Sequence, residues 1–307
     1  MPVIHRSLDA LLHPAALAVG MFDGVHLGHQ AILSSMLEFA RAHHYEPWIF
    51  SFEGMPEHLS ESRKSMTKLY DSALQTYYLS QTNATLIRQP FTQSFANMSA
   101  IDFVKRVSNS VIFCGADWRF GKGAAGDVSF LEAHQVETHV VPDVCYKGKR
   151  ISSTRIREAV AEGKMDEASA MLGRPWTFYG RVTHGRGLAG KTFGIPTLNL
   201  PYVGRAGERL SPLARGVYVG RAEMLHSQGK PSVYSALINF GVAPTVKKEA
   251  EPLFEVHLLD VTGDFYGKDV KLSIEHPLLR PEIKFESLDA LCAQLQTDVR
   301  QCREMGQ

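Results

Sequence analysis

The sequence predicts an α/β protein in two parts: a doubly wound parallel sheet, then a small antiparallel β-barrel with a C-terminal helix. In the first half, short apolar runs alternate with amphipathic helical patterns, which is typical of parallel βαβ units. After Leu172 the pattern changes to strand-like runs separated by glycine and proline. At 307 residues the chain is long enough for two domains. We therefore expect one domain at residues 1–172 and a second at 173–307.

The individual elements follow from the period of the apolar residues, which is about two for a strand and 3.6 for a helix. In the first half we expect strands at 15–20, 47–52, 85–87, 111–115 and 138–141. Helices are expected from about Gly28, at 66–80, at 99–107, from Ser152 or Ser153 to about Gly163, and at 165–172. In the second half we expect strands at 176–184, 216–223, 233–240, 253–260 and 269–275, and a helix at 287–301.

Composition excludes several classes of protein. Lysine and arginine number 33 against 32 aspartates and glutamates, a net charge of +1, which argues against a protein that coats nucleic acid or an anionic membrane. The four cysteines are scattered and form no CxxC pair, which fits a reducing compartment. No signal peptide or membrane span is expected. The sequence thus predicts a soluble cytoplasmic protein, a monomer or weak homo-oligomer, with no nucleic-acid or membrane partner.

The strongest local signal is GMFDGVHLGH at Gly20–His29, where the first strand gives way to the first helix. A helix N-terminus has unpaired N–H groups and a partial positive charge, so it attracts phosphate. His26 and His29 are three residues apart and project from one side of that turn. There they can donate hydrogen bonds to a triphosphate as charge moves onto departing pyrophosphate. Two surface histidines without a role are the competing interpretation.

A second candidate is ISSTRIR at Ile151–Arg157. Its hydroxyls and the Arg157 guanidinium stand at a helix start, where the helix dipole and the cation both favour phosphate. By itself the segment is better explained as an ordinary serine-capped helix.

Together the two motifs resemble those of prokaryotic FAD synthetases, members of the HxGH superfamily of nucleotidyltransferases. GMFDGVHLGH matches GxFDGxHxGH, and ISSTRIR matches ISSTxIR. The resemblance implies a Rossmann-like FMN adenylyltransferase domain in which His26, His29 and Arg157 are catalytic. It implies nucleotide contacts from Gly20, Phe22, Asp23, Gly24, Ser152, Ser153 and Thr154. Arg155 occupies the variable position of the motif and receives no role.

Between these motifs, GADWRFGKGAAGD at Gly115–Asp127 is similar to the family's GxDFRFGxxxxGD segment. It also contains GxGxxG, but a dinucleotide fingerprint follows its strand directly and opens a helix. Here five residues intervene, so we interpret the segment as a loop near the flavin and adenine and not as a dehydrogenase site. The resemblance implies flavin contacts from Asp117, Arg119 and Phe120.

In the second half, GRGLAGKT at Gly185–Thr192 matches GxxxxGK[ST] letter for letter. That phosphate-binding pattern needs a helix directly afterwards, but the next residues, FGIPTLNLP, contain two prolines and a glycine. We therefore reject a Walker-type fold and expect a Gly-rich phosphate loop between strands. Its expected nucleotide contacts are Gly185, Gly187 and Lys191.

The same stretch resembles the riboflavin kinase signature, in which a Gly-rich loop leads into GxPTxN. Thr197 and Asn199 are two residues apart in an extended segment and therefore point to the same side. The resemblance assigns both to Mg²⁺ and nucleotide phosphate, and hard oxygen ligands suit Mg²⁺. Turn chemistry around Pro196 is the alternative interpretation.

Further matches follow in family order through the second half: Pro212 with GVY at 216–218, NFGVAPT at 239–245, FEVHLLD at 254–260 and DFYGK at 264–268. Glu255 is the implied general base, which orients and deprotonates the ribityl hydroxyl that attacks the γ-phosphate. Arg280, in LLRPEIKF, is implied to bound the flavin site. A structural ion pair is the alternative for Arg280.

Three positions depart from the family pattern. Where the family usually has TFxPHP, this chain has SFEGMP, so Met55 replaces the histidine. The LTxxxEK element is reduced to MTKLYDS, which lacks its lysine and ends at Ser72. PTAN is PTLN here, with Leu198 beside the expected metal ligands. The first two changes concern flavin positioning in the N-terminal domain and leave the ATP-binding motifs intact.

The resemblance covers about residues 15–298 and predicts a bifunctional enzyme of flavin cofactor synthesis. The barrel would transfer the γ-phosphoryl group of ATP to riboflavin, giving FMN. The N-terminal domain would transfer AMP from a second ATP to FMN, giving FAD and pyrophosphate. The expected partners are riboflavin, FMN and ATP, with Mg²⁺ as the cofactor. The alternatives are a riboflavin kinase with an impaired N-terminal domain, and a flavin-binding protein without turnover.

Overall fold

The computed structural model describes residues 3–53, 67–184, 197–204, 207–225, 231–242, 252–261 and 263–305. It divides the chain into two compact units. Unit 1 consists of residues 1–66 and 72–153, and unit 2 of residues 67–71 and 154–307. The division therefore precedes most of α6 (Ser153–Ala161) and all of α7 (Met165–Leu172). These helices belong with unit 2, where the carbonyl of Val160 accepts a hydrogen bond from the amide of Ala214 at 3.2 Å.

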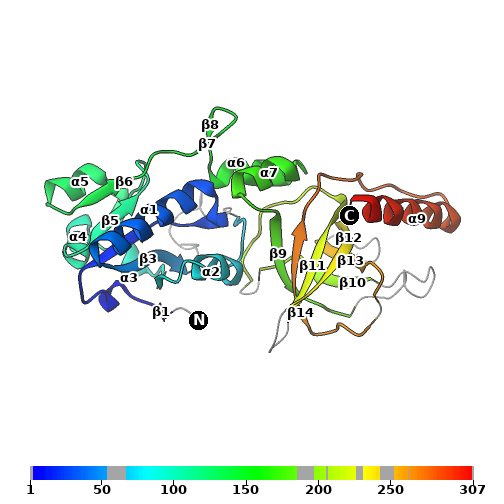
Figure 1. The fold of residues 1–307 in the computed structure, drawn as a ribbon, viewed down its shortest axis with the longest axis horizontal. Helices are drawn as coiled ribbons and strands as arrows, with labels where there is room; N and C mark the ends of the chain where they lie inside the picture. The colour runs from blue at the N-terminus through cyan, green and yellow to red at the C-terminus, as the bar shows by residue number, and fades with distance from the viewer. Residues whose placement is uncertain are drawn as a thin grey trace. The chain divides into compact units, whose positions relative to one another are not determined.

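Unit 1 is built on a six-stranded parallel sheet in the order β1-β4-β3-β2-β5-β6. The strands are β1 (Ile4–His5), β2 (Ala15–Val19), β3 (Glu46–Glu53), β4 (Thr85–Pro90), β5 (Val111–Cys114) and β6 (Thr138–Val140). The helices are α1 (Leu27–His43), α2 (Ser72–Ser80), α3 (Gln93–Ala96), α4 (Ala100–Val107) and α5 (Val128–Ala133), with short 3-10 turns η1 (Leu8–Ala10), η2 (Asp23–Val25) and η4 (Lys122–Ala124). A hairpin of β7 (Cys145–Tyr146) and β8 (Lys149–Arg150) precedes α6. The predicted doubly wound parallel sheet is confirmed (Figure 1).

The central strand β2 explains why the sheet is covered on both faces. Its five residues AALAV are all buried, and alternate residues of a strand face opposite sides. Ala16 and Ala18 belong to one apolar cluster with residues of α1 and α2. Leu17 and Val19 belong to the other cluster, with residues of α4 and α5. A strand without polar positions can only be buried in this way, between two layers of helix.

The predicted helix at 66–80 begins only at Ser72, so the prediction is wrong for residues 67–71. This segment forms backbone contacts within unit 2 instead. The amide of Lys68 donates to the carbonyl of Arg209 at 2.9 Å, and the amide of Ser211 donates to the carbonyl of Lys68 at 2.8 Å. The ammonium group of Lys68 forms an ion pair with Glu208, and both side chains are nearly buried. Long-range pairing has thus replaced local helix formation.

Unit 2 contains a six-stranded antiparallel sheet in the order β10-β13-β12-β11-β14-β9. The strands are β9 (Trp176–Arg181), β10 (Leu198–Pro201), β11 (Gly216–Leu225), β12 (Ser232–Val242), β13 (Pro252–Leu258) and β14 (Asp269–Ile274). A bridge between Thr183 and Asn199 joins the two edges of the sheet at one point, so the sheet curves as a half barrel. This confirms the predicted antiparallel architecture.

The C-terminal helix α9 (Leu288–Met305) covers one face of this sheet beside β12 (Figure 1). Val217, Val219 and Leu237 form an apolar cluster on that face with Val299 and Cys302 of the helix. The opposite face carries the core residues of β13 and its neighbours, such as Phe254 and Val256, which are fully buried. The sheet therefore has a core face and a face shared between α9 and polar side chains.

Candidate active sites

Two motifs of unit 1, Gly20–His29 and Gly115–Asp127, lie where the strand order of its sheet reverses. From β2 the chain proceeds outward through β3 and β4, and it then returns to the other side of β2 as β5. In open α/β sheets, ligands bind at the carboxyl ends of the strands that flank such a reversal. The Gly20–His29 motif follows β2, and the Gly115–Asp127 loop follows β5. Topology therefore places both at one edge of the sheet.

The turn after β2 is held in an uncommon backbone conformation. Phe22, Gly24 and Val25 have φ angles of 50°, 78° and 42°. Gly24 adopts this region without a steric penalty, whereas a β-branched residue such as Val25 adopts it only when its surroundings impose it. Strain of this kind is concentrated at functional turns. The consequence here is a sharp entry into α1 at His26.

His26 caps the N-terminus of α1 and stacks on His29. The Nδ1 atom of His26 accepts a hydrogen bond from the amide of His29 at 3.3 Å. The two rings lie 3.6 Å apart between centroids and 16° from parallel, and the edge of Phe22 packs against His29 at 5.2 Å. Because Nδ1 of His26 is an acceptor, the neutral ring carries its proton on Nε2, which can donate to a ligand. The expected pairing of the two histidines is therefore present at a helix N-terminus.

The start of the Ile151–Arg157 motif lies against the Gly20–His29 motif. The hydroxyl of Ser153 donates to the carbonyl oxygen of Asp23 at 2.9 Å. Ser152 and Ser153 are half-buried, and Thr154 is exposed. Arg157 belongs to unit 2, where its Nε donates to the carbonyl of Thr67 at 3.1 Å. Its expected catalytic role stays a prediction.

In the loop after β5, Asp117 is engaged by an arginine that directly precedes the second motif. The guanidinium of Arg150 lies 2.8 Å from Asp117 and also pairs with Asp143 at 3.0 Å. Hydrogen bonding to Arg150 lowers the pKa of Asp117. Arg119 is exposed and donates to the neighbouring carbonyl of Trp118. The expected flavin contacts of Asp117 and Arg119 stay predictions.

Phe120, the third expected flavin contact, is 7% exposed and belongs to the apolar core of unit 1. Its ring packs against Phe103 at 4.8 Å and Trp118 at 4.7 Å between centroids. A Cβ on Gly126 would collide with the same ring, so this glycine is needed for the loop to close over it. The described contacts of Phe120 are packing contacts, and its flavin contact stays a prediction.

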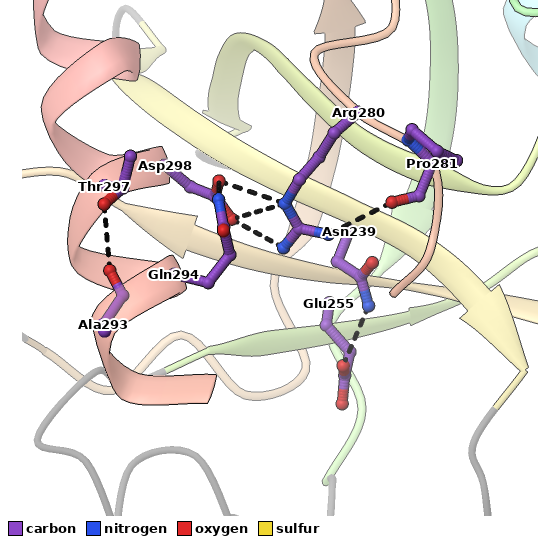
Figure 2. A network of polar contacts seen from close by, with 8 residues as sticks. All are labelled: Asn239, Glu255, Arg280, Pro281, Ala293, Gln294, Thr297 and Asp298. Atoms are coloured by element: carbon purple, nitrogen blue, oxygen red, sulfur yellow. Dashed lines mark hydrogen bonds and ion pairs between the residues drawn. The ribbon is translucent and has the colours of Figure 1, made fainter. Parts of the chain in front are cut away.

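In unit 2, three polar residues lie directly opposite one another on adjacent strands. Asn199 of β10 pairs in register with Glu255 of β13, which pairs in turn with Asn239 of β12. Their side chains therefore share one face of the sheet, since cross-strand partners point the same way. The Nδ2 atom of Asn239 donates to Oε2 of Glu255 at 3.3 Å (Figure 2). Glu255 is exposed, so its carboxylate is accessible to a substrate.

Arg280 forms a buried ion pair with α9. Its Nε lies 3.0 Å from both carboxylate oxygens of Asp298, and its Nη2 lies 2.6 Å from Oδ2 (Figure 2). Asp298 is fully buried and also accepts a hydrogen bond from Gln294 at 2.8 Å. The structure thus shows the structural ion pair that was the alternative for Arg280. A direct flavin contact from this residue stays a prediction.

Some expectations fall outside the described part of the chain. Gly185, Gly187 and Lys191 of the Gly-rich loop lie there, as does Met55. Within the described ranges, no group of three or more histidine, cysteine, aspartate or glutamate side chains is arranged to hold a metal ion.

A cavity of about 260 Å³ in unit 1 lies away from the Gly20–His29 and Gly115–Asp127 motifs. Among its lining residues, His13 precedes β2 and Ser110 precedes β5. It is therefore at the amino ends of these parallel strands, whereas the motifs follow their carboxyl ends.

Sequence reasoning did not single out Asn239, although it lies in the NFGVAPT match, nor Asp298 of α9. The two residues become visible only through their partners. Asn239 is set opposite Glu255 by strand register, and Asp298 meets Arg280 from a different element. The NFGVAPT match could have identified Asn239 from the sequence. No sequence pattern distinguishes Asp298 from other aspartates on an amphipathic helix.

The fold and these two clusters define a class of protein, in which a nucleotidyltransferase unit is joined to a riboflavin kinase-like antiparallel unit. The family model for FAD synthetase matches residues 9–155, and that for riboflavin kinase matches residues 172–306.

Curated relatives match both halves together. The bifunctional riboflavin kinase/FMN adenylyltransferase of Escherichia coli K12 is 34% identical, covering 98% of this chain and 96% of the relative. The Haemophilus influenzae protein of the same description is 31% identical, covering 96% and 95%. The chain belongs to the bifunctional riboflavin kinase/FMN adenylyltransferase family.

One solved structure shares the fold over nearly the whole chain. It is described as a macrolide-efflux protein from Streptococcus pneumoniae and matches with a TM-score of 0.84 at 28% identity, covering 98% of each chain. In the part of this chain that the structure describes, no helix is long and apolar enough to cross a membrane.

Proposed function

We propose that the chain carries out both reactions of its family at two separate clusters, one in each unit. It phosphorylates riboflavin to FMN with ATP, and it adenylylates FMN to FAD with a second ATP. The observation that supports this best is the presence of two chemically different arrangements of polar side chains. A stacked histidine pair stands at a helix N-terminus in unit 1, and an exposed carboxylate is oriented by an amide in unit 2.

Adenylyl transfer needs no covalent enzyme intermediate, because the phosphate of FMN is already a nucleophile. One of its oxygens forms a bond to the α-phosphorus of ATP, the bond to the bridging oxygen breaks, and pyrophosphate leaves. His26 and His29 donate hydrogen bonds to the departing pyrophosphate, where negative charge develops. The backbone of Gly20–Gly24 and the hydroxyls of Ser152 and Ser153 bind the phosphates, whereas the roles expected of Thr154 and Arg157 stay predictions.

In unit 2, Glu255 accepts the proton of the ribityl hydroxyl as that oxygen attacks the γ-phosphorus of ATP, and ADP leaves. The hydrogen bond from Asn239 holds Oε2 of Glu255, and in this proposal Oε1 accepts the proton. Mg²⁺, when bound with ATP, neutralises charge on the transferring phosphates. The hydroxyl of Thr197 and the amide oxygen of Asn199 are hard oxygen donors of the kind this ion takes, and Asn199 stands opposite Glu255.

The test is to incubate the full chain with riboflavin, ATP and Mg²⁺ and to resolve riboflavin, FMN and FAD by chromatography. We expect both FMN and FAD. FMN without FAD would contradict the bifunctional proposal and support a kinase with an impaired N-terminal domain. The absence of any product would support a passive flavin-binding protein.

The cytoplasmic location and the monomeric or weakly oligomeric state also belong to this proposal.

A further inference from the structure

Three buried polar side chains of unit 1 form a chain of hydrogen bonds that ends on the carbonyl oxygen of Met21. The hydroxyl of Ser51 donates to this oxygen at 3.2 Å, and Nε2 of Gln75 donates to it as well. Nη1 of Arg88 donates to Oε1 of Gln75. Ser51, Gln75 and Arg88 are 0%, 5% and 4% exposed and come from β3, α2 and β4. Two elements, β3 and α2, therefore donate to one backbone atom, and a third, β4, supports it through Gln75.

Arg88 holds the acceptor end of the Gln75 amide, while the donor end of that amide faces the Met21 carbonyl. A guanidinium has only donors, whereas an amide has a donor end and an acceptor end. With Arg88 in place, the amide oxygen faces the guanidinium and the NH₂ group faces the Met21 carbonyl. Without Arg88, the buried amide oxygen would lose this donor, and the Gln75 side chain would be held only at its NH₂ end. Leaving a buried polar group unsatisfied is costly.

The carbonyl that receives these bonds directly precedes the strained turn. It belongs to the peptide between Met21 and Phe22, and Phe22 begins the run of positive φ angles that leads to His26. Fixing this peptide plane fixes the direction in which the chain leaves β2. The ring of Phe22 also packs against His29, so an error at this peptide reaches both members of the histidine stack.

We propose that Gln75 and Arg88 are positioning residues for adenylyl transfer, which hold the Met21–Phe22 peptide and through it the His26–His29 stack. This inference rests on the proposed adenylyltransferase function of that turn. Neither residue belongs to the sequence motifs of unit 1, and their hydrogen bonds link them to each other and to the Met21 carbonyl. Their effect should therefore be on the rate of the chemical step, because the stack acts on charge that develops in the transition state.

The test compares Arg88→Met, Arg88→Lys, Gln75→Leu and Gln75→Glu in the full-length protein. We measure kcat and KM for FAD formation from supplied FMN, and for FMN formation from riboflavin as an internal control. Arg88→Met and Gln75→Leu should lower the kcat of FAD formation about ten-fold or more, with KM changed less than about three-fold. FMN formation should stay within about two-fold of the wild type.

Two of these variants distinguish a role in positioning the Met21–Phe22 peptide from a role in packing alone. Arg88→Lys keeps a donor-only cation and should recover most of the lost rate. Gln75→Glu keeps the volume and the contact with Arg88, but it sets a carboxylate against the Met21 carbonyl and should therefore lose as much rate as Gln75→Leu. Arg106→Met, which removes a partly exposed arginine of α4 that pairs with Asp9, is the matched control and should change neither activity.

Folding is checked by circular dichroism and thermal unfolding. Should Arg88→Met fail to fold, Ser51→Ala removes the other donor to the same carbonyl with the loss of one atom, and it should lower the kcat of FAD formation several-fold. Wild-type kcat in Arg88→Met or in Ser51→Ala would overturn the inference, as would a rise in KM alone or a parallel fall in FMN formation. A wild-type protein that makes no FAD would instead contradict the proposed function.

Discussion

The hydroxyl of Ser153 donates a hydrogen bond to the carbonyl of Asp23, which lies 130 residues earlier in the chain. This bond joins the start of the Ile151–Arg157 motif directly to the Gly20–His29 motif, without passing through the sheet. Because the acceptor is a backbone atom of the strained turn, the serine supports the shape of the turn as well as standing at the start of α6.

Ser153→Ala should therefore lower the rate of FAD formation. A single neutral hydrogen bond contributes about 1 kcal/mol, which corresponds to a rate about five-fold lower. The measurement is FAD formation from supplied FMN. Ser108→Ala, which removes an exposed hydroxyl that donates to the carbonyl of Lys105 at the end of α4, is the control. Equal rates in the two variants would argue against a role for the Ser153 bond.

Gly28→Ala tests the histidine stack by crowding it. A Cβ at this position would lie 3.2 Å from Nδ1 and Cε1 of His26, closer than ordinary contacts, so the ring would have to move by a few tenths of an ångström. Gly28 lies in the first turn of α1, where alanine suits the helix. We expect unchanged or higher thermal stability together with slower FAD formation. A faster or unchanged reaction would show that the position of the stack is not critical.

Glu255→Gln and His29→Ala should have reciprocal effects on the two reactions. Glu255→Gln removes the proton acceptor of unit 2 and should lower FMN formation by about 10²–10⁴-fold, while FAD formation from supplied FMN continues. His29→Ala should reduce FAD formation and spare FMN formation. Each variant is assayed with both substrates, and loss of both activities in either one would contradict independent sites.

Asp298→Ala should destabilise unit 2. It leaves the nearly buried guanidinium of Arg280 without its carboxylate, and breaking a buried pair costs about 3–5 kcal/mol in the free energy of unfolding. Arg303→Ala on the same helix breaks an exposed pair with Asp260 and should cost less than about 1 kcal/mol. The comparison is made by denaturant unfolding monitored through loss of FMN formation. Similar costs for both variants would mean that the Arg280–Asp298 pair contributes no more than a surface contact.

Local patterns predicted those elements whose burial is decided by their own sequence. The five apolar residues of β2 and the amphipathic stripe of α1 were predicted to within one or two residues. The helix expected at 99–107 is α4, which starts at Ala100 with Ser99 as its cap. His26 and His29 were predicted as a pair because they are three residues apart across the turn that opens the first helix.

Features that depend on distant partners were not predictable in this way. The segment 67–71 has a helical pattern, but its backbone is satisfied by residues 209–211, which no local window contains. Arg88 directly follows the apolar run of the strand expected at 85–87, and this pattern gives no sign that its guanidinium is buried against Gln75. Likewise, Arg280 matched a motif, but its partner Asp298 lies on a different element. In each case the deciding contact joins elements whose proximity only the fold creates.

The ion pair between Lys68 and Glu208 has a consequence for how the molecule is made. The two residues are 140 positions apart, yet both belong to unit 2. During synthesis Lys68 leaves the ribosome long before Glu208 exists, so the last contacts of unit 2 must wait while unit 1 is completed between them. A chain beginning at residue 173 would also lack the ammonium group that pairs with the nearly buried carboxylate of Glu208. Unit 2 as the fold defines it is therefore assembled from two separate stretches of sequence, and its short stretch is synthesised first.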